Sequence, residues 1–262
     1  MRAPAIFIGH GSPMNALEHN SHTEAWAALG QSFGKPTAIL AISAHWYIRG
    51  TAVTAMPDPP TIHDFGGFPA ALHAFDYPAP GDPALAARVQ SLLAPIDVRL
   101  DDEWGLDHGT WAVLCHVYPH ADVPIVQLAI DGTKPPRFHF ELGKRLAALR
   151  DEGIMLLGSG NVVHNLRVMR RTNGAGAYPW AVQFNEAVRG FLSRNAHGPL
   201  VDYHLLGEPA ALSVPTPEHY LPMLYIAGAR RVDDTFSVTT DGIDLASVSM
   251  LSFAYRTTEA RS

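Results

Sequence analysis

The chain has 262 residues, 47% hydrophobic and 17% charged, which is enough apolar material for a packed core and excludes a disordered chain. Its net charge of −6 excludes the basic surface that nucleic acids or anionic membranes require. The sequence contains no run of about 18 apolar residues, so no membrane-spanning segment is predicted. The N-terminus lacks the pattern of a secretion signal, so we expect a cytoplasmic protein. The single cysteine, Cys115, excludes an internal disulfide; it lies in an apolar run and is expected to be a buried, inert thiol.

Short apolar runs alternate with helical patterns along most of the chain. In chain order they predict a strand at 5–8, a helix at 22–33, a strand at 38–42, a weaker strand at 51–55, a helix at 83–93, a weaker strand at 97–100, strand 125–130, helix 136–150, strand 154–157, helices 179–195 and 218–229, a weaker strand at 235–239 and strand 248–253. This alternation predicts one α/β domain over residues 1–262, with a central mixed, mostly parallel sheet and helices on both faces. Segments 56–60 and 65–83, rich in Gly or Pro, are expected to be long loops.

Five of the fourteen histidines stand in short contexts of Gly, Ser, Asn and Pro. His10 follows strand 5–8, His45 follows strand 38–42, and His164 follows strand 154–157 and a Gly-Ser-Gly-Asn turn. Because an α/β sheet gathers the ends of its strands, these side chains can converge on one ion. Three or more imidazoles suit a divalent first-row metal such as Zn or Fe. For each, a turn histidine bonded to nearby backbone is the alternative, and for His108 and His219 spacing alone does not decide.

Most of the remaining histidines need no special role. His116 is expected to be a satisfied helix residue and His73 a surface or rim residue, and the others are expected among polar or helical surface residues: His19, His22, His120, His139, His197 and His204. No CxxC pair and no HExxH helix is present, which excludes the common sequence-local zinc sites. The Gly-Ser-Gly at 158–160 is too short for a nucleophile elbow and lacks the lysine of a P-loop.

Six short motifs follow one another along the chain: Gly-His-Gly-Ser-Pro at 9–13, Ser-Ala-His-Trp at 43–46, His-Asp-Phe-Gly-Gly-Phe-Pro at 63–69, Asp-His-Gly-Thr-Trp at 107–111, Gly-Ser-Gly-Asn-Val-Val-His-Asn-Leu at 158–166 and Thr-Pro-Glu-His-Tyr-Leu-Pro at 216–222. In this order they resemble the motifs of the class III extradiol ring-cleavage dioxygenases, and more closely those of the 4,5-DOPA dioxygenase group of the LigB-like superfamily. The resemblance implies an α/β fold with one divalent metal at an end of the sheet, and a catechol and O₂ as substrates. The product would be of the muconic semialdehyde type.

The resemblance also implies roles for the histidines. His10 and His45 would be metal ligands. Where the protocatechuate-cleaving branch has a glutamate completing a 2-His-1-carboxylate triad, this chain departs: the matching ligand is His219, with Glu218 as a fallback. His164 would be the active-site base and can also reach a bound zinc, and His108 would be a second acid/base group. Fe(II) is expected for activity and Zn(II) in the isolated protein.

Around this centre the aromatic side chains of Trp46, Phe65, Phe68 and Tyr220 are expected to line the substrate pocket, with core packing as the alternative for each. Any amino-acid tail on the substrate would meet residues that the sequence does not fix; Arg49, Arg167 and Asp64 are candidates.

Two other functions stay open. A zinc-dependent hydrolase would need an open metal position and a carboxylate base, for which Glu218 or Asp107 would serve. A non-catalytic LigB-like protein that binds a metal or ligand is the second. The sequence does not decide the catechol, the regiochemistry of cleavage, the physiological metal, whether His164 is ligand, base or both, or the oligomeric state.

Overall fold

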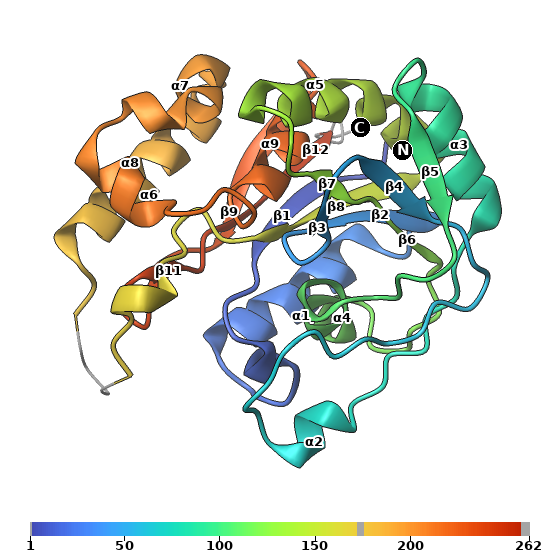
Figure 1. The fold of residues 1–262 in the computed structure, drawn as a ribbon, viewed down its shortest axis with the longest axis horizontal. Coiled ribbons are helices and arrows are strands. Elements are labelled where there is room, and N and C mark those ends of the chain that lie inside the picture. The colour runs from blue at the N-terminus through green and yellow to red at the C-terminus, as the bar shows by residue number, and fades with distance from the viewer. Residues whose placement is uncertain (1, 172–175, 258–262) are drawn as a thin grey trace, which may run out of the picture.

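The computed structural model describes residues 2–171 and 176–257 (Figure 1). A six-stranded central sheet runs through the molecule. In spatial order its strands are β6 (Ile125–Gln127), β2 (Ala38–Ser43), β8 (Ile154–Gly160), β1 (Ala5–Gly9), β12 (Ser252–Thr257) and β9 (Asp234–Thr240). The pairs from β6 to β1 are parallel, and β12 is antiparallel to both of its neighbours. The predicted mixed, mostly parallel sheet is therefore confirmed.

Helices cover both faces of this sheet, as predicted (Figure 1). One face carries α1 (Ser21–Phe33) and α4 (His108–Val117), and the other carries α5 (Pro136–Leu146) and α9 (Leu221–Gly228). The remaining elements are α2 (Ala70–His73), α3 (Pro83–Leu93), α6 (Pro179–Ser193), α7 (His197–Val201), α8 (Glu208–Ser213), β3 (Tyr47–Ile48), β4 (Thr51–Thr54), β5 (Val98–Asp101), β7 (Ile130–Asp131), β10 (Ile243–Asp244), β11 (Val248–Ser249) and four short 3-10 turns. Among the described residues, no helix is long and apolar enough to cross a membrane.

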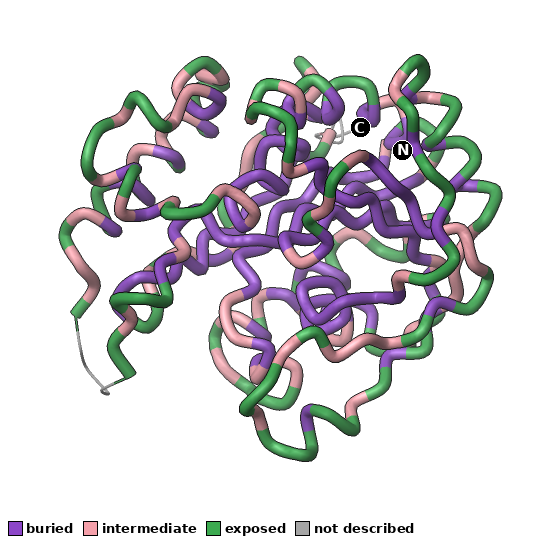
Figure 2. The backbone as a smooth tube through the Cα atoms, in the orientation of Figure 1, coloured by how far each residue is buried: buried purple, intermediate pink, exposed green. Residues whose placement is uncertain are grey.

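The continuous apolar runs of the central strands follow from this double cover. Side chains of a strand alternate between its faces. Phe7 of β1 therefore packs in the cluster under α5 and α9, while Ile6 and Ile8 pack in the cluster under α1 and α4. Figure 2 shows β1, β2 and β8 buried along their length, with exposed residues mainly on the outer helices and loops. A strand buried on both faces reads as a run of apolar residues, without alternation.

Helix starts also follow local sequence signals. Asp82 caps α3 by accepting from the Leu85 backbone N–H, with Pro83 in the first turn, as predicted. Pro222 lies in the first turn of α9, where its missing N–H costs no intrahelical bond. That placement explains how the segment predicted as a helix at 218–229 accommodates a proline, although the helix begins only at Leu221.

Two predicted strands are wrong as single elements. Segment 125–130 divides into β6, in the central sheet, and β7, which pairs with β3. Segment 248–253 divides into β11, which pairs with β10, and the start of β12. In both places the backbone leaves one sheet for another within two residues, which the apolar run does not reveal. The helix predicted to end at 150 ends at Leu146 and continues as a 3-10 turn to Glu152.

Of the predictions for single residues, those for His116 and Cys115 agree with the structure and that for His139 does not. His116 is satisfied inside α4, where its Nε2 lies 2.7 Å from the Asn15 carbonyl oxygen. Burial raises the pKa of the Cys115 thiol to about 12, in agreement with an inert cysteine. The surface assignment of His139 is wrong: its side chain is fully buried, with Nδ1 2.9 Å from the Tyr225 hydroxyl.

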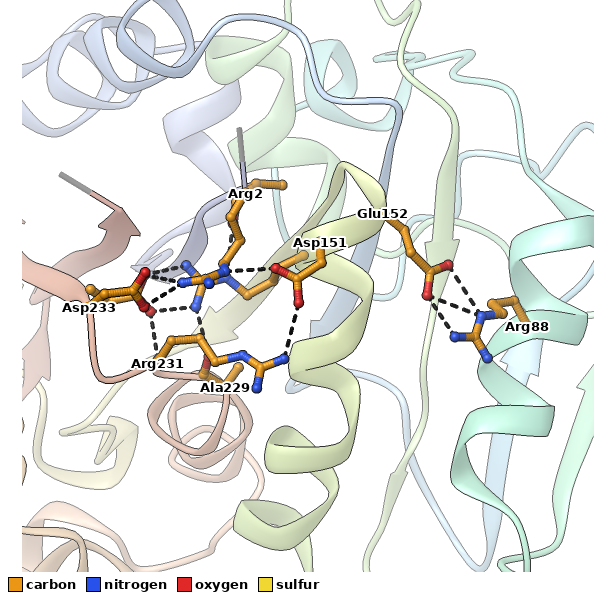
Figure 3. Close-up of polar contacts among 10 residues, drawn as sticks. Arg2, Arg88, Asp151, Glu152, Ala229, Arg231 and Asp233 are labelled. Atoms are coloured by element: carbon orange, nitrogen blue, oxygen red, sulfur yellow. Dashed lines mark hydrogen bonds and ion pairs between the residues drawn. The ribbon is translucent and has the colours of Figure 1, made fainter. Parts of the chain in front are cut away.

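A polar network lies at the edge of the sheet where β1, β2 and β8 begin. The guanidinium of Arg150 is fully buried and pairs with the buried carboxylate of Asp234. Nearer the surface, Arg2 bridges Asp151 and Asp233 (Figure 3). This network connects the N-terminal segment to the 3-10 turn before β8 and to the start of β9. It thereby stabilises the side of the sheet where the parallel strands begin, opposite their carboxyl ends.

Candidate metal centre

Three of the candidate histidines follow the carboxyl ends of adjacent parallel strands. His10 comes directly after β1, His45 two residues after β2, and His164 four residues after β8. These strands lie in the order β2, β8, β1. The carboxyl edge of an α/β sheet is where ligands bind in this fold class, and the structure brings the three side chains to that edge.

The other two candidates reach the same edge from helix starts. His108 is the first residue of α4, and His219 comes two residues before α9. The approach of His219 depends on Gly160, because a side chain there would collide with the His219 carbonyl group. Ring centroids lie 5.1 Å apart for His10 and His45, 5.4 Å for His10 and His219, and 5.2 Å for His45 and His219.

The spacing of the nitrogens fits a shared cation. The Nε2 atoms of His10 and His45 lie 3.3 Å apart, and each pair of ligand atoms among His10, His45 and His219 lies within 4.8 Å. Two nitrogens bound at about 2.1 Å to one tetrahedral ion would be about 3.4 Å apart. The donor set of three imidazoles suits Zn or Fe, so the residues present fit a divalent metal.

The hydrogen bonds of the other ring nitrogens determine which nitrogen is free to bind. Nδ1 of His10 lies 2.9 Å from the Ser159 hydroxyl oxygen, and this hydroxyl donates its only hydrogen to the Gly109 carbonyl. The Ser159 oxygen must therefore accept from His10 Nδ1–H. Nδ1 of His219 likewise donates to the Glu218 carboxylate at 3.3 Å. In both neutral rings Nε2 is left with its lone pair, the form that a metal ligand requires.

Asp64 organises the other side of the cluster. Its Oδ2 accepts from His45 Nδ1 at 3.2 Å, and its Oδ1 accepts from His108 Nδ1 at 2.9 Å. Burial opposes the charge of Asp64, but the hydrogen bonds from His108 and His45 outweigh it and hold the pKa of the carboxyl well below its ordinary value. A charged Asp64 is therefore present at any pH near neutral.

Burial keeps two of the candidate ligands neutral. It lowers the pKa of His10 and of His219 well below the ordinary value, and the neighbouring imidazoles lower both further. For His45, burial lowers the pKa, but the hydrogen bond to Asp64 and the nearby carboxylates outweigh it, so that its pKa is raised. Neutral imidazole is the state that binds metal, so His10 and His219 are ready to coordinate at neutral pH.

The two predicted acid/base histidines each lie against a candidate ligand. The ring of His164 stacks on that of His219, with centroids 3.5 Å apart and planes at 10°. The ring of His108 lies 3.8 Å from that of His45. Burial lowers the pKa of His164 to about 4, and burial also lowers that of His108 although Asp64 opposes the shift. Both rings are therefore neutral at neutral pH, each within reach of a group bound at the cluster.

The predicted aromatic lining is only partly at the site. Phe65 meets His108 edge-on at 5.4 Å, and Phe68 packs against Phe65. Tyr220 does not line a pocket, because its ring is fully buried between Phe184 and Tyr203. Trp46 is also a packing residue: it is 3% exposed and stacks on Trp104 at 5.6 Å. For these two the alternative of core packing is correct.

Two overlapping groups could also hold a cation: His45 with Asp64 and His108, and His164 with Glu218 and His219. In the first, Asp64 already bonds to Nδ1 of both rings. In the second, Glu218 bonds to His219 Nδ1 and accepts from the Thr216 hydroxyl at 2.7 Å. These contacts account for the carboxylates without an ion, whereas the Nε2 atoms of His10 and His45 lie 3.3 Å apart, which is the spacing of two nitrogens bound to one ion. The His10, His45 and His219 group is therefore the strongest metal candidate.

Sequence reasoning missed two members of this cluster. The sequence assigned no role at the metal to Ser159 or to Asp64. In the structure Ser159 contacts the ring of His10, and Asp64 contacts the rings of His45 and His108. Ser159 comes at the end of β8 beside β1, so its place in the sheet would have pointed to His10. Asp64 lies in a loop 44 residues before His108, and only the folded chain brings the two together.

Comparison with known proteins points to one family. A family model described as the catalytic LigB subunit of aromatic ring-opening dioxygenase matches residues 4–240. The chain is 56% identical over 255 residues to a protein of Escherichia coli (strain K12) named 4,5-DOPA dioxygenase extradiol, covering 96% of this chain and 94% of that protein. A Beta vulgaris protein of the same name is 38% identical, covering 86% and 85% of the two chains. The crystal structure of an uncharacterized protein from Escherichia coli K12 superposes with a TM-score of 0.85 at 52% identity, covering 97% of this chain and 99% of that one.

Proposed function

The chain belongs to the LigB family of ring-opening extradiol dioxygenases, and we propose that it cleaves the ring of a catechol with O₂ at one divalent ion held by His10, His45 and His219. The observation that carries the proposal is the 3.3 Å approach of the His10 and His45 Nε2 atoms, with Nδ1 of each ring held by an acceptor. The names of the relatives favour a DOPA-like catechol, and a muconic semialdehyde-type product is proposed for its cleavage. Fe(II) is the proposed working ion, and Zn(II) is expected in the isolated protein.

When bound, the ion supplies a Lewis acid for the catechol oxygens and a redox path to O₂. The protein side chains supply proton transfer. A ring nitrogen of His164, kept neutral by burial, takes the proton of a catechol hydroxyl, and the nearby Glu218 carboxylate stabilises the imidazolium that forms. His108 donates its Nδ1–H to Asp64, so its Nε2 is the atom that can take up the proton of the second catechol hydroxyl and return that proton to the product as the ring opens. The ring of Phe65 packs edge-on against that of His108.

Anaerobic reconstitution with Fe(II), followed by a panel of catechols that includes DOPA, tests the proposal. The expected result is O₂ uptake that matches formation of a yellow ring-opened product. His164→Ala should lose turnover while its catechol affinity stays within about tenfold, or about 1.4 kcal/mol. Turnover near that of the wild type would remove His164 from the role of base.

Two outcomes would contradict the proposed activity itself. Fe(II)-loaded protein that consumes no O₂ with any catechol would reject it in favour of a non-catalytic binding protein. Hydrolysis supported by zinc in the absence of O₂ would favour the metal-dependent hydrolase. Because these outcomes differ in metal and in oxygen requirement, one set of assays separates them.

A further inference from the structure

The carboxylate of Asp64 contacts two histidines through three nitrogen atoms. Oδ1 accepts both from the backbone N–H of His108 and from its Nδ1, each at 2.9 Å, and Oδ2 lies 3.2 Å from His45 Nδ1. The side chain of Asp64 is 17% exposed, and those of His108 and His45 are 8% and 18% exposed. One carboxylate thus joins a proposed metal ligand to a proposed proton donor.

We propose that Asp64 is a positioning residue that sets the tautomers of His45 and His108 together, so that both rings carry hydrogen on Nδ1 and present Nε2 to the site. This inference rests on the proposed function, in which Nε2 of His45 faces the metal and Nε2 of His108 faces the substrate. A ring held in this way needs no rearrangement before it binds an ion or transfers a proton. Loss of the residue that hydrogen-bonds to a metal-bound histidine commonly lowers metal affinity by about 10- to 100-fold.

The role requires a carboxylate, because both oxygens of Asp64 are acceptors. In Asp64→Asn the amide oxygen must stay at the Oδ1 position, since the His108 backbone N–H can only donate. The amide nitrogen then faces His45 Nδ1, and two donors oppose each other. The ring of His45 relieves this by moving its hydrogen to Nε2. His45 Nε2 faces His10 Nε2 at 3.3 Å, at the proposed metal position. Once it carries the hydrogen, it has no lone pair with which to bind the ion.

Glu218 provides the natural contrast. Its Oε1 alone accepts from both His219 Nδ1 and the Thr216 hydroxyl. In Glu218→Gln an amide oxygen can make both of these contacts, so His219 keeps its tautomer. The two substitutions make the same chemical change beside two proposed ligands, and only the one at Asp64 forces a tautomer to change.

The group of His45, Asp64 and His108 could itself hold an ion, which would give Asp64 a different role. The geometry favours hydrogen bonding, because both rings direct Nδ1 at Asp64 and the backbone N–H of His108 points to the same oxygen. A backbone N–H beside a cation would be repelled, and an N–H that donates to a carboxylate stabilises the charge on that carboxylate.

Nitrogen-15 NMR of the histidine rings and zinc titration test the inference on the intact apoprotein. In the neutral ring of wild-type His45 we expect the Nδ1–H tautomer, and we expect the wild type to bind one ion per chain. In Asp64→Asn we expect His45 as the Nε2–H tautomer and an affinity for zinc at least tenfold lower. Glu218→Gln should keep the Nδ1–H tautomer at His219 and lose less zinc affinity than Asp64→Asn. Asp82→Asn, at the cap of α3, is the matched control with unchanged binding, since Asn caps helices as well as Asp.

Asp64→Ala sharpens the test and decides it if Asp64→Asn does not fold. Water can replace the lost acceptor, so a mixture of tautomers and an affinity between those of the wild type and Asp64→Asn are expected. A merely structural role predicts the reverse order, because Asn matches Asp in shape and Ala does not. Wild-type affinity with Nδ1–H at His45 in both variants would overturn the inference, as would two ions per wild-type chain. A wild type that binds no metal would instead reject the proposed function.

Discussion

The two ends of the parallel strands hold buried polar clusters of opposite character. Where β1, β2 and β8 begin, the five N–H donors of Arg150 make five hydrogen bonds, two to the Asp234 carboxylate and three to the carbonyl oxygens of Ala3, Ala229 and Tyr255. Where the same strands end, the Nε2 atoms of His10 and His45 lie 3.3 Å apart, while the Nδ1 atoms of these rings face Ser159 and Asp64. The first cluster is complete within the chain, and we propose that a cation completes the second.

This difference teaches how to distinguish a structural polar cluster from a functional one. A buried group whose partners all lie within the chain contributes to the native fold. In the histidine cluster, Ser159, Asp64 and Glu218 contact the Nδ1 atoms of the rings, and the Nε2 atoms face the site. Such buried rings are expected to lower the free energy of unfolding until a ligand binds their Nε2 atoms. The expected consequence is that changes at one end alter folding and changes at the other alter binding.

Substitution of Arg150 should have the largest effect on stability. Arg150→Ala leaves the Asp234 carboxylate buried without its partner and three carbonyl groups without donors, which is expected to cost about 3–5 kcal/mol of the free energy of unfolding. Urea denaturation measures this loss. Zinc affinity of the protein that remains folded should be unchanged, and a fall in that affinity as large as the fall in stability would erase the contrast between the two ends.

Substitution of His10 should show the opposite pattern. His10→Ala removes one of the facing nitrogens, so zinc affinity should fall at least hundredfold, or about 2.7 kcal/mol. The free energy of unfolding of the apoprotein should change by less than about 1.5 kcal/mol, because the substitution also removes a buried polar ring that lacks its ligand. Full metal content in this variant, determined by elemental analysis, would exclude His10 as a ligand.

His139 sharpens the comparison, because it is a buried histidine outside the cluster. Burial lowers its pKa to about 4, against about 6.5 in the unfolded chain. Above pH 6.5 both states are neutral, and between pH 6.5 and 4 the unfolded state takes up the proton first, so acid favours unfolding. The loss reaches at most about 3 kcal/mol near pH 4.

His139→Gln cannot take up a proton at this position, so its free energy of unfolding should fall less steeply between pH 6.5 and 4 than that of the wild type. Denaturation curves of the two apoproteins across this range measure the slopes. Parallel slopes would mean that the acid sensitivity of the fold comes from other groups, including the histidines of the site.

The sequence predicted the framework of the site better than its connections. The runs at 5–8, 38–42 and 154–157 predicted parallel strands, and the position of a histidine after each one placed them at a common edge. Local patterns did not reveal where the chain passes from one sheet to another, as it does after Gln127 and after Ser249. These changes depend on which strand offers a free edge, which is a property of the assembled fold.

The supporting residues could not be derived from spacing for a related reason. The role of Asp64 requires His45 and His108 to meet it from two different elements, and no periodicity in the sequence encodes that meeting. Tyr220 illustrates the converse. Its position beside His219 suggested a pocket wall, but neighbours on a chain that turns into a helix point to different sides, and its hydroxyl bonds instead to the Leu200 carbonyl in the core.

Anomalous X-ray diffraction from crystals loaded with zinc, or with Fe(II) under nitrogen, tests the shared cation most directly. The expected result is one anomalous peak at about 2.0–2.1 Å from the Nε2 atoms of His10, His45 and His219. A peak bound through Asp64, or the absence of a peak at these three nitrogens in fully loaded protein, would contradict the central claim.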